Sequence, residues 1–265
     1  MLYIYELKGQ KQPRDVPEDG LTGIWPEAPY YYLFYEKEVL GSVEGWLKSN
    51  PQWLLTSRYS LPYEKWQDVS SPWTRIGPFA VQTMPCLEKP DAEPGSILLR
   101  IDPGVVFGSG LHPTTRGCLL AIAECFSKGE IRTVVDFGTG TGILAIACVL
   151  LGARRVRAVD CNPLALKFAG KNASVNNVAD RIGFVAADRL GVLNVRSDLL
   201  VVNIEWPFLE ALLRTEDWKN YGRIILSGFL ERKLAMVEEM VRPAFRVSDC
   251  GVFDGWPVVS IVSCG

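Results

Sequence analysis

The feature that most constrains the fold is a glycine-rich stretch between two apolar runs. Residues 134–144 read Val-Val-Asp-Phe-Gly-Thr-Gly-Thr-Gly-Ile-Leu. The β-branched residues before the glycines predict a strand, and the aliphatic run after them predicts a buried helix. Glycine lets the backbone turn sharply and approach a bound molecule closely, because it has no Cβ atom. The stretch therefore predicts a strand–loop–helix unit of an α/β fold, with the loop facing a ligand.

From residue 97 onward, short runs rich in β-branched residues alternate with helix-like segments. The expected strands are 97–101, 133–137, 155–160, 182–186, 199–204 and 223–227. Such alternation is typical of a parallel sheet with crossover helices on its faces. We therefore expect an α/β fold.

Helix starts and the end of the chain add detail. Proline in the first turn, after a residue that can cap a helix, predicts helices over 113–127 and 163–176. Residues 245–253 and 257–262 read as two strands separated only by an Asp-Gly turn, so they must pair antiparallel. Parallel strands followed by a terminal hairpin predict a mixed sheet.

Aromatic residues divide the chain. Eight of nine tyrosines lie at or before Tyr63, and five of eight tryptophans lie at or before Trp73. We expect a small aromatic-rich α+β domain over residues 1–75 and a linker over 76–96, in which three prolines cluster within 84–96. The second domain is then 97–265.

Composition excludes several classes of protein. Twenty-eight basic and 30 acidic side chains leave a net charge of −2, which is against direct binding of nucleic acid, since that affinity depends on a basic surface. The single histidine, His112, excludes Cys2His2 and two-histidine metal sites, and we expect no metal. The seven cysteines form no C-x-x-C pair, as is typical of thiols in a reducing cytoplasm.

Apolar runs do not indicate a membrane protein. The longest one, 142–153, is too short to cross a bilayer. The first residues lack the basic segment and long apolar run of a signal peptide. We therefore expect a cytoplasmic protein without a membrane segment.

The spacing of the loop glycines distinguishes between cofactors. A dinucleotide-binding G-x-G-x-x-G motif that starts at Gly138 would require glycine at position 143, which is isoleucine. Gly138, Gly140 and Gly142, with Asp136 two positions before the first, instead form the pattern of S-adenosylmethionine (SAM) sites. A purely structural role for Asp136, joining the strand end to loop amides, is the alternative.

Polar groups follow the next three strands. Asp160 ends one strand, where its two oxygens can accept hydrogen bonds from both ribose hydroxyls of a nucleoside. Asp188 follows the next, and either accepts from an adenine amino group or caps a helix. Asn203 ends the fourth, and Trp206 and Phe208 follow it at the mouth of the expected crevice. A turn-forming Asn203 and a core Trp206 remain alternatives.

Three segments together resemble a known family. Residues 102–115 read Asp-Pro-Gly-Val-Val-Phe-Gly-Ser-Gly-Leu-His-Pro-Thr-Thr, and they are followed by VVDFGTGTGILAIA from 134 and by Asn203-Ile204. This combination resembles the ribosomal protein L11 methyltransferase family over about residues 60–265. The resemblance implies the seven-stranded mixed sheet of class I SAM-dependent methyltransferases, which is Rossmann-like. It also implies a small N-terminal domain that recognises the substrate.

The resemblance also implies roles for residues. Thr115 and Gly138 would contact SAM, Asp160 would hold its ribose, and Asn203 would lie beside the methyl group. Phe107 and His112 belong to the most family-specific stretch, and we expect them to shape a flap over the cofactor. For His112, an N-cap or hinge role is preferred to that of a base.

The implied reaction transfers a methyl group from SAM to a protein amino group, either a lysine or an N-terminal amine. S-adenosylhomocysteine would be the product, and ribosomal protein L11 is the candidate partner. We hypothesise that the Asn203 side-chain oxygen and the Ile204 carbonyl orient the amine, while Trp206 and Phe208 form the walls of its approach. Glu205 is either a proton acceptor or, as we prefer, an exposed loop carboxylate.

Two other functions remain open. The aromatic residues at 206–208 could stack on a small planar molecule or on a flipped nucleobase, which changes the acceptor but keeps the cofactor. Alternatively, the chain binds SAM without catalysis, and the aromatic N-terminal domain binds a partner protein.

Overall fold

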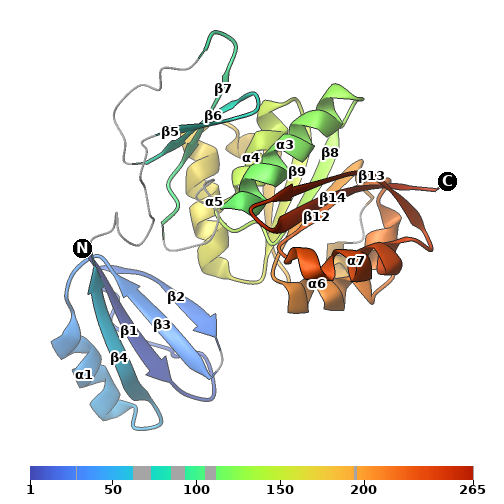
Figure 1. Ribbon diagram of the computed structural model, residues 1–265. Coiled ribbons are helices and arrows are strands. Elements are labelled where there is room, and N and C mark those ends of the chain that lie inside the picture. Colours follow the sequence, from blue (N-terminus) through green and yellow to red (C-terminus); the bar gives the residue numbers. More distant parts are fainter. Residues whose placement is uncertain (28, 62–72, 85–92, 105–111, 194–195, 265) are drawn as a thin grey trace. The chain divides into compact units, whose positions relative to one another are not determined.

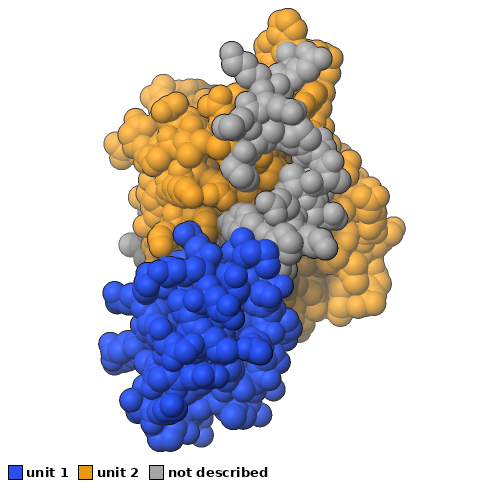
Figure 2. All heavy atoms as spheres, turned by 90° about the vertical axis from the view of Figure 1, so that its left-hand side faces the viewer, with its two compact units in different colours: residues 1–70 blue, residues 71–265 orange. Residues whose placement is uncertain are grey.

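The computed structural model describes two compact units, residues 1–70 and 71–265 (Figures 1 and 2). The residues described are 1–27, 29–61, 73–84, 93–104, 112–193 and 196–264. The division lies close to position 75, where the sequence predicts the first domain to end. None of the described helices is long and apolar enough to cross a membrane.

The first unit is a four-stranded antiparallel sheet with one helix. Its elements are β1 (Leu2–Lys8), β2 (Leu21–Glu27), β3 (Tyr30–Tyr35), α1 (Leu40–Ser49) and β4 (Leu54–Leu61), and the strand order is β2-β3-β1-β4. Aromatic side chains form much of its core: the Tyr5 and Tyr35 rings meet edge to face at 5.6 Å, as do Tyr31 and Trp53 at 5.3 Å. The predicted small α+β domain is confirmed, and its aromatic residues supply its own core.

The second unit contains a seven-stranded mixed sheet. Its strands are β8 (Thr133–Phe137), β9 (Arg155–Asp160), β10 (Ile182–Ala186), β11 (Leu199–Asn203), β12 (Arg223–Ser227), β13 (Phe245–Phe253) and β14 (Trp256–Ser263). The order is β10-β9-β8-β11-β12-β14-β13. The first five strands are parallel, and β14 pairs antiparallel with both β12 and β13. The predicted fold class and terminal hairpin are confirmed.

Helices cover both faces of this sheet (Figure 1). One face carries α3 (Pro113–Ser127), α4 (Ile143–Leu150) and α5 (Pro163–Val175), and the other carries α6 (Trp206–Leu213) and α7 (Leu234–Val241). Short 3-10 helices complete the connections: η1 (Ala179–Arg181), η2 (Leu190–Leu193), η3 (Asp217–Asn220) and η4 (Glu231–Lys233). Successive strand residues serve opposite cores, Val134 facing the α3–α5 layer and Val135 the α6–α7 layer. This double coverage explains why the central strands β8, β11 and β12 are mainly apolar rather than alternating.

The segment before the main sheet differs from expectation in two ways. Strand β7 (Ile97–Ile101) does not join the seven-stranded sheet but pairs parallel with β6 (Phe79–Thr83), which pairs antiparallel with β5 (Trp73–Ile76). Strand β6 lies inside the predicted 76–96 linker, yet all five of its residues are buried. The reason is tertiary: apolar residues of this small sheet pack into the same core as α3 and α4.

Candidate active site

The glycine loop has the conformation that its composition predicts. Gly138, Gly140 and Gly142 have φ values of +79°, +54° and +81°, a region that favours glycine. A Cβ atom on Gly138 would lie 2.2 Å from Cγ2 of Ile204, so this position has no room for a side chain. The backbone amide of Gly138 donates to the Val159 carbonyl at 2.8 Å, which fixes the loop to strand β9.

Asp136 lies beneath the loop and is buried. Its Oδ2 accepts hydrogen bonds from the Thr139 hydroxyl at 2.6 Å and from the Ala145 amide at 3.1 Å. Burial raises the pKa of this carboxyl to about 7. Oδ1 is buried without a partner among the described residues. A buried oxygen in this state is costly unless a donor reaches it, so Asp136 both holds the loop and can accept from a bound molecule.

Asp160, at the end of β9, lies against the same loop. Its Oδ2 accepts from the Gly140 amide at 3.0 Å, and Oδ1 accepts from the Asn162 amide at 2.9 Å. Asn162 in turn caps α5 by accepting from the Leu164 amide at 3.0 Å. Burial raises the pKa of Asp160. Each carboxylate oxygen has a further lone pair, so Asp160 can still accept from two hydroxyl groups.

The start of α3 contributes two predicted residues. His112 is the N-cap: Nδ1 accepts from the Thr114 amide at 3.3 Å, and the ring meets Trp256 edge-on at 5.1 Å. Burial lowers the pKa of His112. Thr115 is buried, and its hydroxyl oxygen has no partner among the described residues. Phe107 lies outside the described residues.

Asn203 is the last residue of strand β11, and Ile204 follows it. Asn203 is half-buried opposite Ser227. A Cβ atom on Gly228, at φ +94°, would lie 2.0 Å from the Ile204 carbonyl oxygen. Ile204 is therefore packed between Gly138 and Gly228. The Ser227-Gly228 pair at the end of strand β12 is the sequence signal that marks this glycine.

The two aromatic residues of α6 differ in their surroundings. Trp206 is half-buried, its ring lies 6.3 Å from that of Phe229, and the Lys233 ammonium lies 4.8 Å from its centroid. Phe208 is 67% exposed, and Glu205 is exposed as well. The structure therefore holds the Trp206 ring in place and leaves Phe208 in solvent.

Asp188 stands apart from the loop contacts. It lies two residues beyond the end of β10, and its side chain is 82% exposed. Its ion-pair partner is Arg189, at 3.9 Å.

The glycine loop, Asp136, Asp160 and Asn203 lie at the same edge of the sheet. Strands β8, β9 and β11 all end at the same edge, and β8 lies between β9 and β11. After β8 the chain adds β9 and β10 on one side of β8, and it then adds β11 and β12 on the other side. In open α/β sheets ligands bind outside the carboxyl ends of the strands at this reversal point. The glycine loop and Asn203 flank it.

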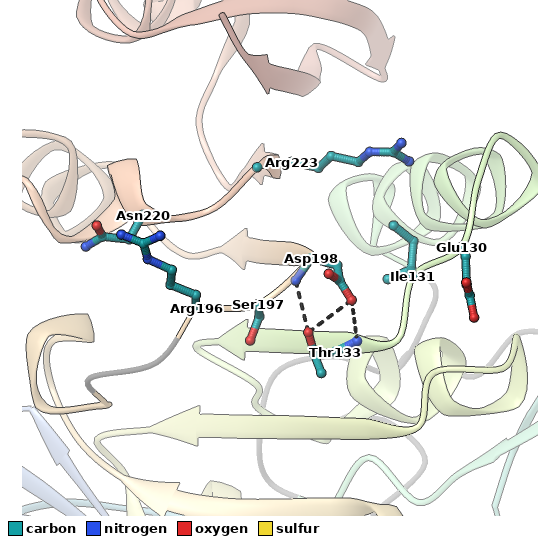
Figure 3. A pocket seen from close by; sticks show the side chains of 9 residues that line it. Glu130, Ile131, Thr133, Arg196, Ser197, Asp198, Asn220 and Arg223 are labelled. Carbon is teal, nitrogen blue, oxygen red and sulfur yellow. Dashed lines mark hydrogen bonds between the residues drawn. The ribbon is translucent and has the colours of Figure 1, made fainter. Parts of the chain in front are cut away.

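A pocket of about 450 Å³ lies at the opposite edge, where β8, β11 and β12 begin (Figure 3). Its lining includes Thr133, Asp198 and Arg223. Asp198 accepts from the Thr133 amide at 2.8 Å and from its hydroxyl at 3.0 Å. None of the predicted site residues lines this pocket.

In this sheet the antiparallel strand β14 lies between β12 and β13, and a glycine loop follows β8. This strand order defines the second unit as a Rossmann-like domain of the class I methyltransferase fold. The model of the family "Ribosomal protein L11 methyltransferase (PrmA)" matches residues 63–263. The chain belongs to this family, as the resemblance of its motifs predicts.

Individual relatives agree with this assignment. A ribosomal protein L11 methyltransferase of Streptococcus pyogenes serotype M4 (strain MGAS10750) is 40% identical over 153 residues, which cover 56% of this chain and 47% of the relative. The chain thus spans about half the length of the curated relatives that it matches.

Solved structures show the same fold. That of the ribosomal protein L11 methylase from Lactobacillus delbrueckii subsp. bulgaricus is 27% identical, with a TM-score of 0.64, and the match covers 73% of this chain and 99% of that one. The human methyltransferase 10 domain containing protein, at 16% identity and a TM-score of 0.51, shares the fold over 62% of this chain and 88% of that one.

Proposed function

We propose that this chain transfers a methyl group from SAM to an amino group of a protein. The observation that carries the proposal is the site at the reversal point of the sheet. There a left-handed glycine loop lies against Asp160, and two buried oxygens, Thr115 Oγ1 and Asp136 Oδ1, lack partners among the described residues. Membership of the family supports methyl transfer.

The described residues fit SAM as the donor. The glycine loop admits a close approach of the ligand, since its three glycines have no Cβ atoms and adopt their positive φ values without strain. Asp160 would accept from the ribose hydroxyls, and Asp136 and Thr115 would accept from polar hydrogens of the cofactor. Asp188 remains the proposed partner of adenine, and His112 the residue that orders the start of α3. When bound, SAM supplies a methyl group on a sulfonium, which is already activated for displacement.

The acceptor side of the site consists of Asn203 and the residues after it. A free lysine has a pKa of about 10.4, so its amine must lose a proton before it can attack. The Asn203 side-chain oxygen and the Ile204 carbonyl would accept the remaining N–H bonds and direct the lone pair toward the methyl group. Gly228 lies directly against the Ile204 carbonyl, where a Cβ atom would meet the oxygen at 2.0 Å. Trp206 and Phe208 would line the approach.

The acceptor is proposed to be a protein because the relatives with the same motifs are named for ribosomal protein L11. In this proposal residues 1–70 recognise that substrate. L11 is therefore the first protein to test.

The deciding experiment incubates the purified chain with SAM labelled in its methyl group, together with purified L11 or a cell lysate. Label is expected in protein, as methylated lysine or a methylated N-terminus. Label in nucleic acid or in small molecules would contradict a protein acceptor. SAM binding without any transferred label would identify a non-catalytic binding protein.

Replacement of Asn203 by alanine tests the orienting role. The Asn203→Ala chain should bind SAM as the wild type does, because its glycine loop is unchanged. Its turnover number should fall by about 100-fold, the loss observed when a single oriented polar group is removed from an active site. A variant with full activity would contradict the role of Asn203.

A further inference from the structure

Helix α5 connects two segments that are distant from it in sequence. The side chain of Asn172, in the last turn of this helix, is fully buried. Its Nδ2 donates to the carbonyls of Asp102 and Thr141, both at 2.9 Å, and its Oδ1 accepts from the Asp102 amide at 2.8 Å. Both amide hydrogens are therefore used, and one carboxamide joins the chain after β7 to the glycine loop.

The contact with Thr141 acts on the last peptide of the glycine loop. Thr141 is fully buried, and Gly142 after it has φ +81° and is the N-cap of α4. A Cβ atom on Gly142 would lie 3.0 Å from that of Ala169, which is also on α5. Helix α5 thus holds this end of the loop by a hydrogen bond and by close packing, whereas Asp136 and Asp160 hold the other parts.

Further contacts with α5 hold Asp102 and Gly104 in place. The Lys171 ammonium pairs with the Asp102 carboxylate at 2.6 Å, and the carboxylate accepts from the Gly104 amide at 3.0 Å. A Cβ atom on Gly104, at φ +55°, would lie 2.0 Å from the Phe168 ring. Residues 102–104 begin the stretch on which the family resemblance rests, so α5 places these first residues relative to the glycine loop.

The helix contains a natural control one turn later. Asn176 pairs with Arg100 as Asn172 pairs with Asp102: its Oδ1 accepts from the Arg100 amide at 2.9 Å, and its Nδ2 donates to the Arg100 carbonyl at 2.6 Å. A spacing of four residues on the helix thus matches a spacing of two on the extended chain. Among the described contacts of the two side chains, only that of Asn172 reaches the glycine loop.

We propose that Asn172 is a positioning residue of the SAM site, which sets the glycine loop at the spacing from residues 102–104 that the cofactor requires. This inference rests on the proposed function, since SAM is the ligand that the loop would bind. Asn172 itself does not touch the cofactor. Its effect should therefore appear in SAM affinity and not only in stability.

The test compares Asn172→Ala with Asn176→Ala. Each variant loses three hydrogen bonds to the main chain, so both should show a similar decrease in Tm. The Kd for SAM, measured by isothermal titration calorimetry, should rise about tenfold in Asn172→Ala, as expected for the loss of one loop hydrogen bond. It should remain at the wild-type value in Asn176→Ala.

If the alanine variant does not fold, Asn172→Ser replaces it in the test, because the serine hydroxyl can donate to one carbonyl. Its Kd should lie between those of the wild type and the fully weakened site. A wild-type Kd in both Asn172 variants, or an equal increase in Asn176→Ala, would overturn the inference. A wild-type chain that does not bind SAM would instead overturn the proposed function.

Discussion

Asp136 is a buried carboxyl whose ionisation is linked to folding. Burial raises its pKa to about 7, whereas an aspartate in an unfolded chain titrates near about 3.9. Between these two values the folded protein retains a proton that the unfolded chain has released. This group therefore makes the free energy of unfolding decrease as the pH rises from about 4 to about 7.

An Asp136→Asn variant lacks this titration. The free energy of unfolding should decrease more steeply with pH in the wild type than in the variant over this range, and the two profiles should run parallel above about pH 8. Urea denaturation at a series of pH values measures both. If the two profiles were parallel over the whole pH range, the pKa of Asp136 would not be raised by folding.

His112 is placed to cap a helix. Its Nδ1 accepts from the Thr114 amide, a role that asparagine also fills well. The His112→Asn chain should therefore keep its turnover number within a few-fold, although it loses the edge contact with Trp256. A loss of about 100-fold or more, the range of general acid–base catalysis, would identify His112 as a proton acceptor instead.

At the scale of elements, the loop after β12 determines where Ile204 lies. In Gly228→Ala the added Cβ atom would meet the Ile204 carbonyl oxygen at 2.0 Å, so the backbone must move. We expect the turnover number to fall more than about tenfold, since a shift of about 1 Å at a reacting centre is enough to cause this.

Gly152 provides the matched control for this variant. It also has a positive φ, +115°, but nothing lies within 4 Å of an added Cβ atom. Gly152→Ala should therefore carry the conformational cost, about 1 kcal/mol, without loss of activity. Equal activity losses in both variants would show that strain, and not the contact with Ile204, is responsible.

At the scale of the whole molecule, the two units have separate cores. Tyr5, Tyr35 and Trp53 belong to the core of the first unit, and Val134 and Val135 belong to the two cores of the second. A chain of residues 73–265 should therefore retain its SAM affinity, because all the proposed cofactor contacts lie within it. It should methylate L11 much less than the full chain.

Calorimetry with SAM and the labelled-methyl assay with L11 measure these two quantities on the same preparation. Circular dichroism should first show that the shortened chain is folded. Full transfer to L11 by the shortened chain would contradict substrate recognition by residues 1–70.

The amino-acid sequence is enough to predict the features that depend on neighbours along the chain. Apolar runs and capping residues predicted the strands of the main sheet and helices α3 and α5 to within about two residues, because periodicity and capping are local effects. The glycine spacing and Asp160 indicated one edge of the sheet as the site for the same reason. Parallel strands place their carboxyl ends together wherever the rest of the chain lies.

Features that join distant segments follow from the packing of the folded chain. Strand β7 has the composition of a main-sheet strand, but its pairing with β6 depends on which apolar surface it covers. The positions of Ile204 against Gly228 and of Asn172 against Thr141 follow from packing between residues far apart in sequence. The exposure of Phe208 likewise depends on what the fold brings to its surroundings, and no local pattern contains that information.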